Sequence, residues 1–280
     1  MAARRQRWSW RVALSYATMA VLSFAVGFPL YWMVKSSLTP PSELFTNPPE
    51  LYPSHVTLQW YETVLFRTDT PGFFLTSLEI ALATMAVCMA VGTLGGYSLT
   101  RFRYPGRELF LFSALMSYVF PAILLFVPIF LILNALDLID TKLGVILAHV
   151  IMTMPLALWM MRSFFLSIPR DLDEAAWVDG AGYFTTFRRI VLPLALPGIF
   201  STAIFVFVMS WNEYLFASVI ATSSENKTLP AGIAEFVTSY DIRWGEIMAL
   251  GTLATIPVVV MFLLIQRFFI KGITAGAVKG

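Results

Sequence analysis

Residues 168–193 read IPRDLDEAAWVDGAGYFTTFRRIVLP, and this polar stretch decides the fold because long apolar runs lie on both sides of it. Pro169 suits the first position of a helix, where the missing N–H of proline is not needed. The next turn is acidic, and the positive end of a helix dipole stabilises carboxylates there. These carboxylates belong to Asp171, Asp173 and Glu174. The sequence therefore predicts a short helix that starts near Pro169.

A second short helix is expected after a glycine break. Gly180 and Gly182 end the first helix, and the segment from Tyr183 to Val191 is again periodic. Two arginines close to its end, followed by Pro193, are typical of the C-terminus of a helix. We expect this second helix to stop before Pro193.

One face of the first helix suits docking onto another protein. Residues three and four apart lie on the same side of a helix. The side chains on this face are small, so they could enter a cleft on a partner. The face consists of Leu172, Ala175, Ala176 and Asp179.

The composition is that of a membrane protein. Of 280 residues, 58% are hydrophobic and 13% are charged, whereas soluble domains have about 25% charged residues. The single cysteine, Cys88, lies in an apolar run, which excludes a disulfide framework and a cysteine metal cluster. We therefore expect one polytopic membrane domain over residues 1–280.

Six apolar stretches are long enough to cross a membrane as helices, for which about 20 residues are needed. They lie near residues 12–34, 72–98, 109–133, 143–165, 197–220 and 246–269. Several contain proline, which kinks a helix where neighbouring groups satisfy the freed carbonyls. These prolines are Pro121, Pro128, Pro155 and Pro257. The predicted fold class is an all-α polytopic membrane protein with six transmembrane helices.

The distribution of positive charge predicts the orientation. If the N-terminus lies inside the cell, 14 of the 19 Lys and Arg residues are cytoplasmic and 5 are outside. Cytoplasmic loops carry the excess of positive charge, so both termini, the loop 168–193 and the tail 271–280 are expected in the cytoplasm. The outer segments are then 35–71, which contains one short helix near 58–66, 137–142 and 221–245.

A pair of glycines predicts close helix packing. Gly92 and Gly96 have GxxxG spacing in the second apolar stretch. Small residues let membrane helices approach each other closely. We interpret this helix as packed inside the bundle, in preference to a dedicated dimer contact.

Ionisable residues within the apolar stretches are candidates for function. Glu79, His149 and Glu213 each lie about 10 Å below the expected outer surface, at 1.5 Å per residue. Such residues are costly in a membrane and usually face the bundle interior. They could form one polar layer, either as packing or as a proton relay.

The sequence WNEY, residues 211–214, has two interpretations. Trp211 and Tyr214 could stack on sugar faces while Asn212 and Glu213 bond to sugar hydroxyls. Alternatively, WNEY belongs to an interfacial aromatic belt, with a hydrogen bond to a neighbouring helix. With Glu79 and His149, these residues form the candidate substrate path.

The sequence contains no phosphate loop, HExxH zinc motif, GxSxG elbow or dinucleotide fingerprint. We expect no enzyme activity and no cofactor in this chain. If nucleotide energy drives it, another chain must bind ATP and Mg.

Residues 174–193 resemble the EAA loop of permease subunits in binding-protein-dependent ABC importers, which have the type I importer fold. The whole chain is similar to the carbohydrate branch, of the maltose-transporter second-permease type, on the basis of its six spans, WNEY and the terminal GITAGAVKG. The resemblance implies that the loop couples the pore to an ATPase. The coupling residues are Glu174, Ala175, Ala176, Asp179, Gly180, Ala181 and Phe187.

The resemblance also implies the partners. These are a homologous permease subunit, two cytoplasmic ATPase subunits, an extracytoplasmic solute-binding protein and membrane lipid. No nucleic acid is expected as a partner. The tail would reach the ATPase interface through Thr274, Ala275, Gly276 and Lys279. The expected location is the inner membrane of a bacterium or archaeon. The expected function is sugar import; the alternatives are a permease for a polyol, a glycerol phosphate ester or another solute, and a proton-coupled secondary transporter.

Overall fold

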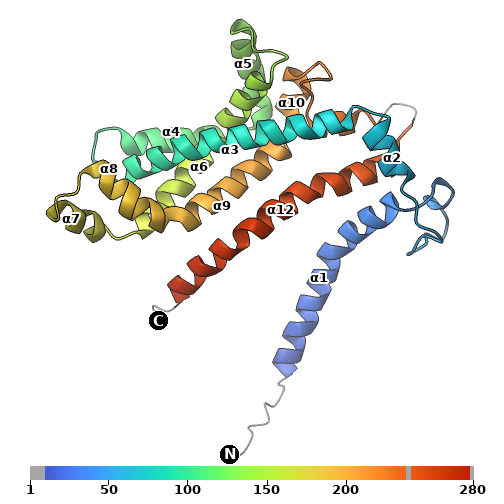
Figure 1. Cartoon of the computed structure of the whole chain (residues 1–280), viewed down its shortest axis with the longest axis horizontal. Helices are drawn as coiled ribbons and strands as arrows, with labels where there is room; N and C mark the ends of the chain where they lie inside the picture. Colours follow the sequence, from blue (N-terminus) through green and yellow to red (C-terminus); the bar gives the residue numbers. More distant parts are fainter. Residues whose placement is uncertain (1–9, 238–240, 278–280) are drawn as a thin grey trace, which may run out of the picture. The chain divides into compact units, whose positions relative to one another are not determined.

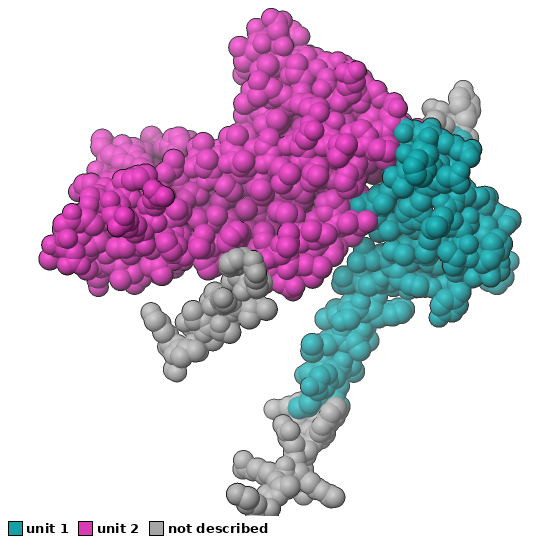
Figure 2. All heavy atoms as spheres, viewed as in Figure 1, with its two compact units in different colours: residues 1–68, 236–253 teal, residues 69–235, 254–280 magenta. Residues whose placement is uncertain are grey.

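The structure is a computed structural model that describes residues 10–237 and 241–277, with side chains up to Gln266 except that of residue 11. Over these ranges the secondary structure is helical, apart from one antiparallel bridge between Val237 and Ile242. The chain divides into two compact units (Figure 2): residues 1–68 with 236–253, and residues 69–235 with 254–280. The prediction of an all-α fold is confirmed.

The first unit contains three helices and the start of a fourth. They are α1 (Trp10–Ser37), η1 (Pro41–Glu43), α2 (Gln59–Phe66) and the first part of α12 (Trp244–Ala277). Helix α2 is the short helix expected in the first outer segment. Its Trp60 donates from Nε1 to the Thr39 carbonyl at 2.8 Å, and its Tyr61 hydroxyl lies 2.7 Å from the Ser37 hydroxyl. These contacts hold α2 against the end of α1.

Residues 69–235, with the rest of α12, form the second unit (Figure 2). Its central helices α3, α6 and α9 pack side by side, and α4 lies against α6 (Figure 1). In chain order the helices are α3 (Thr70–Arg101), α4 (Arg107–Val119), α5 (Ala122–Ala135), α6 (Lys142–Ser167), α7 (Asp171–Val178), α8 (Tyr183–Thr186), the π-helical turn η2 (Phe187–Val191), α9 (Leu192–Trp211), α10 (Leu215–Ile220) and α11 (Leu229–Ala234).

Within residues 10–237 and 241–277, five helical segments are long and apolar enough to cross a membrane, and a bent pair of helices makes a sixth if it is counted as one span. The five are Val12–Ser37, Thr70–Arg101, Lys142–Ser167, Tyr183–Trp211 and Trp244–Gln266. The bent pair, α4 and α5, corrects the prediction of one helix over 109–133, because the helix axis bends by 105° between the two halves. Pro121 disfavours helical backbone at the residue before it, and Phe120 is accordingly extended, with φ −65° and ψ 136°.

Two expected helix ends are also wrong. The second helix of the loop does not stop before Pro193, because η2 leads directly into α9. The wider π turn changes the hydrogen-bond register just before Pro193, which then occupies the first turn of α9, where proline is tolerated. The span predicted over 197–220 is interrupted: α9 ends at Trp211, and α10 is a separate short helix.

The two glycines of the GxxxG pair in α3 pack inside the chain, as expected. A Cβ atom on Gly92 would lie 3.6 Å from Ala157 Cβ, which is ordinary contact. A Cβ on Gly96 would lie 2.8 Å from Met161 Cβ and 2.9 Å from the backbone nitrogen of Arg162. The close approach of α3 to α6 therefore depends on Gly96 more than on Gly92.

Gly96→Ala is expected to destabilise the protein, and Gly92→Ala is its matched control. Both changes gain the same helix propensity, so their difference isolates the clash with α6. Overpacking a tight contact costs about 1–3 kcal/mol. Thermal unfolding in detergent should give a lower midpoint for Gly96→Ala than for Gly92→Ala, and equal midpoints would contradict the close packing.

Candidate functional site

The turn after α7 has the hydrogen bonds of a Schellman motif. Gly180 has φ +83°, a left-handed conformation that favours glycine. Its N–H donates to the Trp177 carbonyl at 3.0 Å, and the N–H of Ala181 donates to the Ala176 carbonyl at 2.9 Å. Gly182, in contrast, has φ −74°, so the backbone conformation at this position does not require glycine. Of the two glycines, Gly180 therefore sets the sharp turn of the loop.

Helix α7 has a buried face and an exposed face. Asp173 and Ala176 are 1% and 5% exposed. Glu174, Ala175 and the 88%-exposed Val178 face away from the chain. Leu172 and Asp179 are exposed as well, but the expectation that Ala176 shares their face is wrong. Helix α7 begins at Asp171, two residues after Pro169.

Phe187 belongs to the core and not to an exposed docking surface. Its ring centroid lies 4.7 Å from that of Tyr97, and it shares a buried cluster with Phe165 and Val191. Ala181 is partly buried. Of the predicted coupling residues, Ala176 and Phe187 are thus positioned to hold the loop on the bundle, while Glu174, Ala175, Asp179 and Gly180 remain exposed.

A buried ion pair that no sequence pattern indicated lies beneath α7. Arg101 Nη2 lies 3.0 Å from Asp173 Oδ2, with side chains 4% and 2% exposed. The Tyr97 hydroxyl donates to Asp173 Oδ1 at 3.3 Å, and Arg101 also donates to the Ile168 carbonyl at 3.0 Å. In the sequence, Asp173 is notable only as one of three acidic residues in the first turn of a helix, and Arg101 only as one of the 14 Lys and Arg residues expected in the cytoplasm. The spacing of 72 residues between the two partners gave no signal in the sequence.

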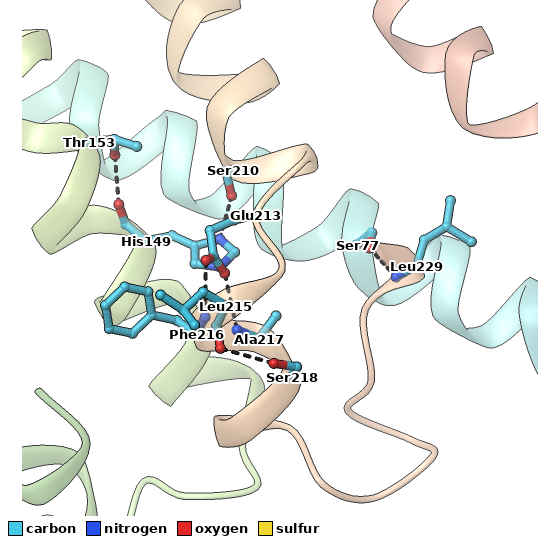
Figure 3. Close-up of polar contacts among 10 residues, drawn as sticks. All are labelled: Ser77, His149, Thr153, Ser210, Glu213, Leu215, Phe216, Ala217, Ser218 and Leu229. Atoms are coloured by element: carbon cyan, nitrogen blue, oxygen red, sulfur yellow. Dashed lines mark hydrogen bonds and ion pairs between the residues drawn. The ribbon is translucent and has the colours of Figure 1, made fainter. Parts of the chain in front are cut away.

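A second polar site joins α6 to the end of α9 (Figure 3). His149 Nδ1 lies 2.7 Å from the Ser210 hydroxyl, and Nε2 lies 3.0 Å from Glu213 Oε2. A neutral imidazole with its proton on Nε2 satisfies both bonds, since it donates to the carboxylate and accepts from the hydroxyl. His149 is 1% exposed, so both ring nitrogens are used inside the protein.

Glu213 also explains why WNEY is not helical throughout. Its Oε1 accepts from the backbone N–H of Phe216 at 3.0 Å, and its Oε2 accepts from that of Ala217 at 3.1 Å. These N–H groups lie in the first turn of α10, where they lack helical partners. The Glu213 carboxylate therefore caps α10 and also binds His149. The helix is interrupted between Trp211, where α9 ends, and Leu215, where α10 begins.

The other WNEY residues divide between the interior and the surface. Trp211 is 3% exposed, and its Nε1 donates to the Ala254 carbonyl at 3.1 Å. Its ring stacks on Phe207, with centroids 5.9 Å apart. Asn212 and Tyr214 are exposed. The structure therefore favours the packing interpretation for Trp211 and Glu213, and leaves Asn212 and Tyr214 available for contact.

Trp211→Ala is expected to reduce stability rather than solute affinity. Removing a buried tryptophan leaves a cavity and costs about 3–5 kcal/mol. Uptake kinetics on the surviving protein should show an unchanged apparent KM, with a maximal rate reduced in proportion to the assembled protein. A raised KM at normal protein levels would restore the sugar-contact interpretation.

Glu79 does not join the polar layer expected from the sequence. Its carboxylate is exposed and lies 2.5 Å from Lys142 Nζ, at the start of α6. His149 and Glu213 are paired with each other instead. The predicted grouping of three ionisable residues is therefore wrong for Glu79.

The segment between α5 and α6 contacts the segment that follows α10. Asp140 Oδ1 accepts from the backbone N–H groups of Ser223 at 2.8 Å and Thr222 at 3.0 Å. The bond from the Ser223 N–H is the largest of the effects that lower the pKa of Asp140 below its ordinary value. The segment after α10 is thus held to the start of α6.

The predicted C-terminal tail is partly helical. Helix α12 extends through Ala277, so Thr274, Ala275 and Gly276 have helical backbone, although the sequence suggested a tail from residue 271. Lys279 lies outside the described residues.

Helices that are long and apolar enough to cross a membrane define an integral membrane protein. Residues 89–275 match the family of binding-protein-dependent transport system inner membrane components. The match covers more than half of the chain, which therefore belongs to this family. It is a pore-forming, inner-membrane permease subunit of an ABC importer, and such subunits are not themselves catalytic.

Two relatives and one solved structure agree with this assignment. The chain is 36% identical over 256 residues to the trehalose/maltose permease MalG of Thermococcus litoralis, covering 90% of this chain and 91% of the relative. It is 36% identical over 263 residues to the trehalose permease SugB of Mycobacterium tuberculosis, covering 93% and 94%. A bacterial ABC transporter that imports alginate has the same fold, with a TM-score of 0.79 and 19% identity over 96% of this chain and 99% of that chain.

Proposed function

We propose that this permease subunit imports a small carbohydrate, a disaccharide in the first instance. The observation that carries the proposal is the similarity, over at least nine-tenths of both chains, to permeases named for trehalose and maltose. Exposed Asn212 and Tyr214 next to the break after α9 supply an amide and an aromatic ring, which are groups suited to a sugar.

The importer that we propose contains this chain, a homologous permease subunit, two cytoplasmic ATPase subunits and an extracytoplasmic solute-binding protein. ATP and Mg are bound by the ATPase subunits. Both termini and the loop 168–193 lie in the cytoplasm, where the exposed side of α7 meets an ATPase subunit. The tight Schellman turn at Gly180 and the buried face of α7 support this role, because they present Glu174 and Ala175 on a fixed loop.

The proton-coupled alternative has less support. A relay needs a chain of titratable groups, but Glu79 pairs with Lys142 and not with His149. The remaining pair, His149 and Glu213, is occupied in capping α10 and bonding Ser210.

To test the proposal, the complex is purified from the membrane of the native organism through a tag at the N-terminus of this chain. We expect ATPase subunits to co-purify, and proteoliposomes with the binding protein to take up radiolabelled maltose or trehalose when ATP is enclosed. Glycerol 3-phosphate serves as the competing solute, and an imposed pH gradient without ATP as the competing energy source. Uptake of glycerol 3-phosphate alone, or uptake driven by pH alone, would overturn the proposal.

A further inference from the structure

The loop 168–193 is fastened to one particular helix. The Arg101–Asp173 ion pair joins the last residue of α3 to the first turn of α7, and it is buried. Arg170, just before α7, donates to the Thr100 carbonyl, and Arg101 donates to the Ile168 carbonyl. Bonds to the end of α3 thus come from the segment leading into α7 and from α7 itself.

The contacts with the end of α3 lie on the side of α7 opposite to its exposed residues. Asp173 and Ala176 face the bundle, whereas Glu174 and Val178 face outward. A partner that pushes or pulls the outward face acts on the bundle through the inward face. Among the inward contacts, the ion pair carries a charge on each partner and is shielded from water, where the attraction between charges is stronger than in water, so it resists separation.

Helix α3 continues from this point to the outer segments without a break. It contains 32 residues, which corresponds to a length of about 48 Å at 1.5 Å per residue. Near its other end, the Ser77 hydroxyl accepts from the Leu229 N–H at 2.7 Å (Figure 3), and the Thr76 hydroxyl donates to the Glu225 carbonyl at 3.2 Å. A single helix therefore connects the cytoplasmic loop with residues 225–229.

We propose that Arg101 and Asp173 are positioning residues that make α3 move together with α7. A displacement of the loop is then delivered along α3 to the outer segment 221–235. The inference rests on the proposed docking of an ATPase onto α7. It assigns the transmission of that movement to one buried ion pair and one helix.

The test compares Asp173→Asn with Asp171→Asn in the complete transporter. Both changes remove a carboxylate from the first turn of α7, but Asp171 is exposed and Asp173 is paired. Uptake and ATP hydrolysis are measured on the same proteoliposomes. For Asp173→Asn we expect hydrolysis within twofold of the unmodified complex and uptake per ATP reduced at least tenfold. Asp171→Asn should keep its uptake per ATP within twofold.

A merely structural ion pair would give a different result. Hydrolysis and uptake would then fall together, in proportion to the amount of assembled complex, and the proposal would be overturned. Equal losses for Asp171→Asn and Asp173→Asn, or normal coupling in Asp173→Asn, would overturn it as well. If Asp173→Asn fails to assemble, the double variant Arg101→Met with Asp173→Leu removes both charges and leaves no unpaired ion. Low uptake per ATP in this double variant supports the proposal, and uptake per ATP equal to that of the unmodified complex contradicts it.

A readout that needs no solute separates this inference from the proposed function. Amide hydrogen exchange in residues 221–235 is compared before and after adding a non-hydrolysable ATP analogue to the complex. We expect a change in the unmodified complex that is absent in Asp173→Asn. If the unmodified complex takes up no sugar but shows this difference, only the sugar assignment fails. If it takes up sugar and the exchange response survives in Asp173→Asn, only the ion-pair inference fails.

Discussion

Gly180→Pro is expected to lower ATP-driven uptake more than tenfold while the protein still inserts into the membrane. Proline fixes φ near −65°, whereas Gly180 has φ +83°. Proline also lacks the N–H that donates to the Trp177 carbonyl at 3.0 Å. The turn that ends α7 cannot form in this variant, so the exposed face of α7 loses its fixed position. Uptake in proteoliposomes and the yield of purified protein are the measurements.

Two alanine variants provide the matched control. No atom lies within 4 Å of a Cβ added to either Gly180 or Gly182, so neither variant creates a clash. Gly180→Ala still carries the left-handed strain of about 1–2 kcal/mol, which Gly182→Ala lacks. We expect Gly180→Ala to reduce uptake partly and Gly182→Ala to leave it unchanged. Equal effects of the two alanine variants would show that the left-handed turn is not the cause.

Glu213→Ala is expected to destabilise the protein by about 2–4 kcal/mol. It removes the acceptor for two N–H groups of α10, and loss of a cap costs about 1 kcal/mol. It also leaves His149, which is 1% exposed, without a partner for Nε2, at a cost of about 1–3 kcal/mol. The apparent Tm in detergent should fall by at least about 4 °C.

Asn212→Ala is the control for this change. Asn212 is the neighbouring residue, but its side chain is exposed and, among the described residues, bonds only the Val208 carbonyl of its own helix, at 2.8 Å. Surface changes of this kind stay within about 0.5 kcal/mol. If Glu213→Ala proved as stable as Asn212→Ala, the carboxylate would not hold α10 and His149 as described.

Most of the transmembrane organisation could be predicted from the sequence, because apolar length alone identifies a spanning helix. Helices α1, α3 and α6 end within a few residues of the expected bounds. The errors lie where single residues redirect the backbone. Pro121 splits a predicted span, and the carboxylate of Glu213 starts a new helix within another.

The site was predictable only where its residues are close in the sequence. The turn at Gly180 follows from glycine and its immediate neighbours. The pairing of Arg101 with Asp173 depends on how α3 and α7 meet, and no local pattern encodes that contact. Periodicity likewise placed Ala176 with Ala175, although the fold of the loop turns Ala176 towards the bundle.

The π turn at Phe187–Val191 sets the rotational phase of the helix that follows. One residue corresponds to about 100° of rotation around an α-helix axis. If this turn rewound as ordinary α-helix with Phe187 fixed, the far end of α9 would revolve by a comparable angle and carry Ser210 away from His149. The single additional residue of the π turn thus sets the rotation of α9 about its own axis, so that the C-terminal half of α9 faces α6 without any change in the orientation of the loop.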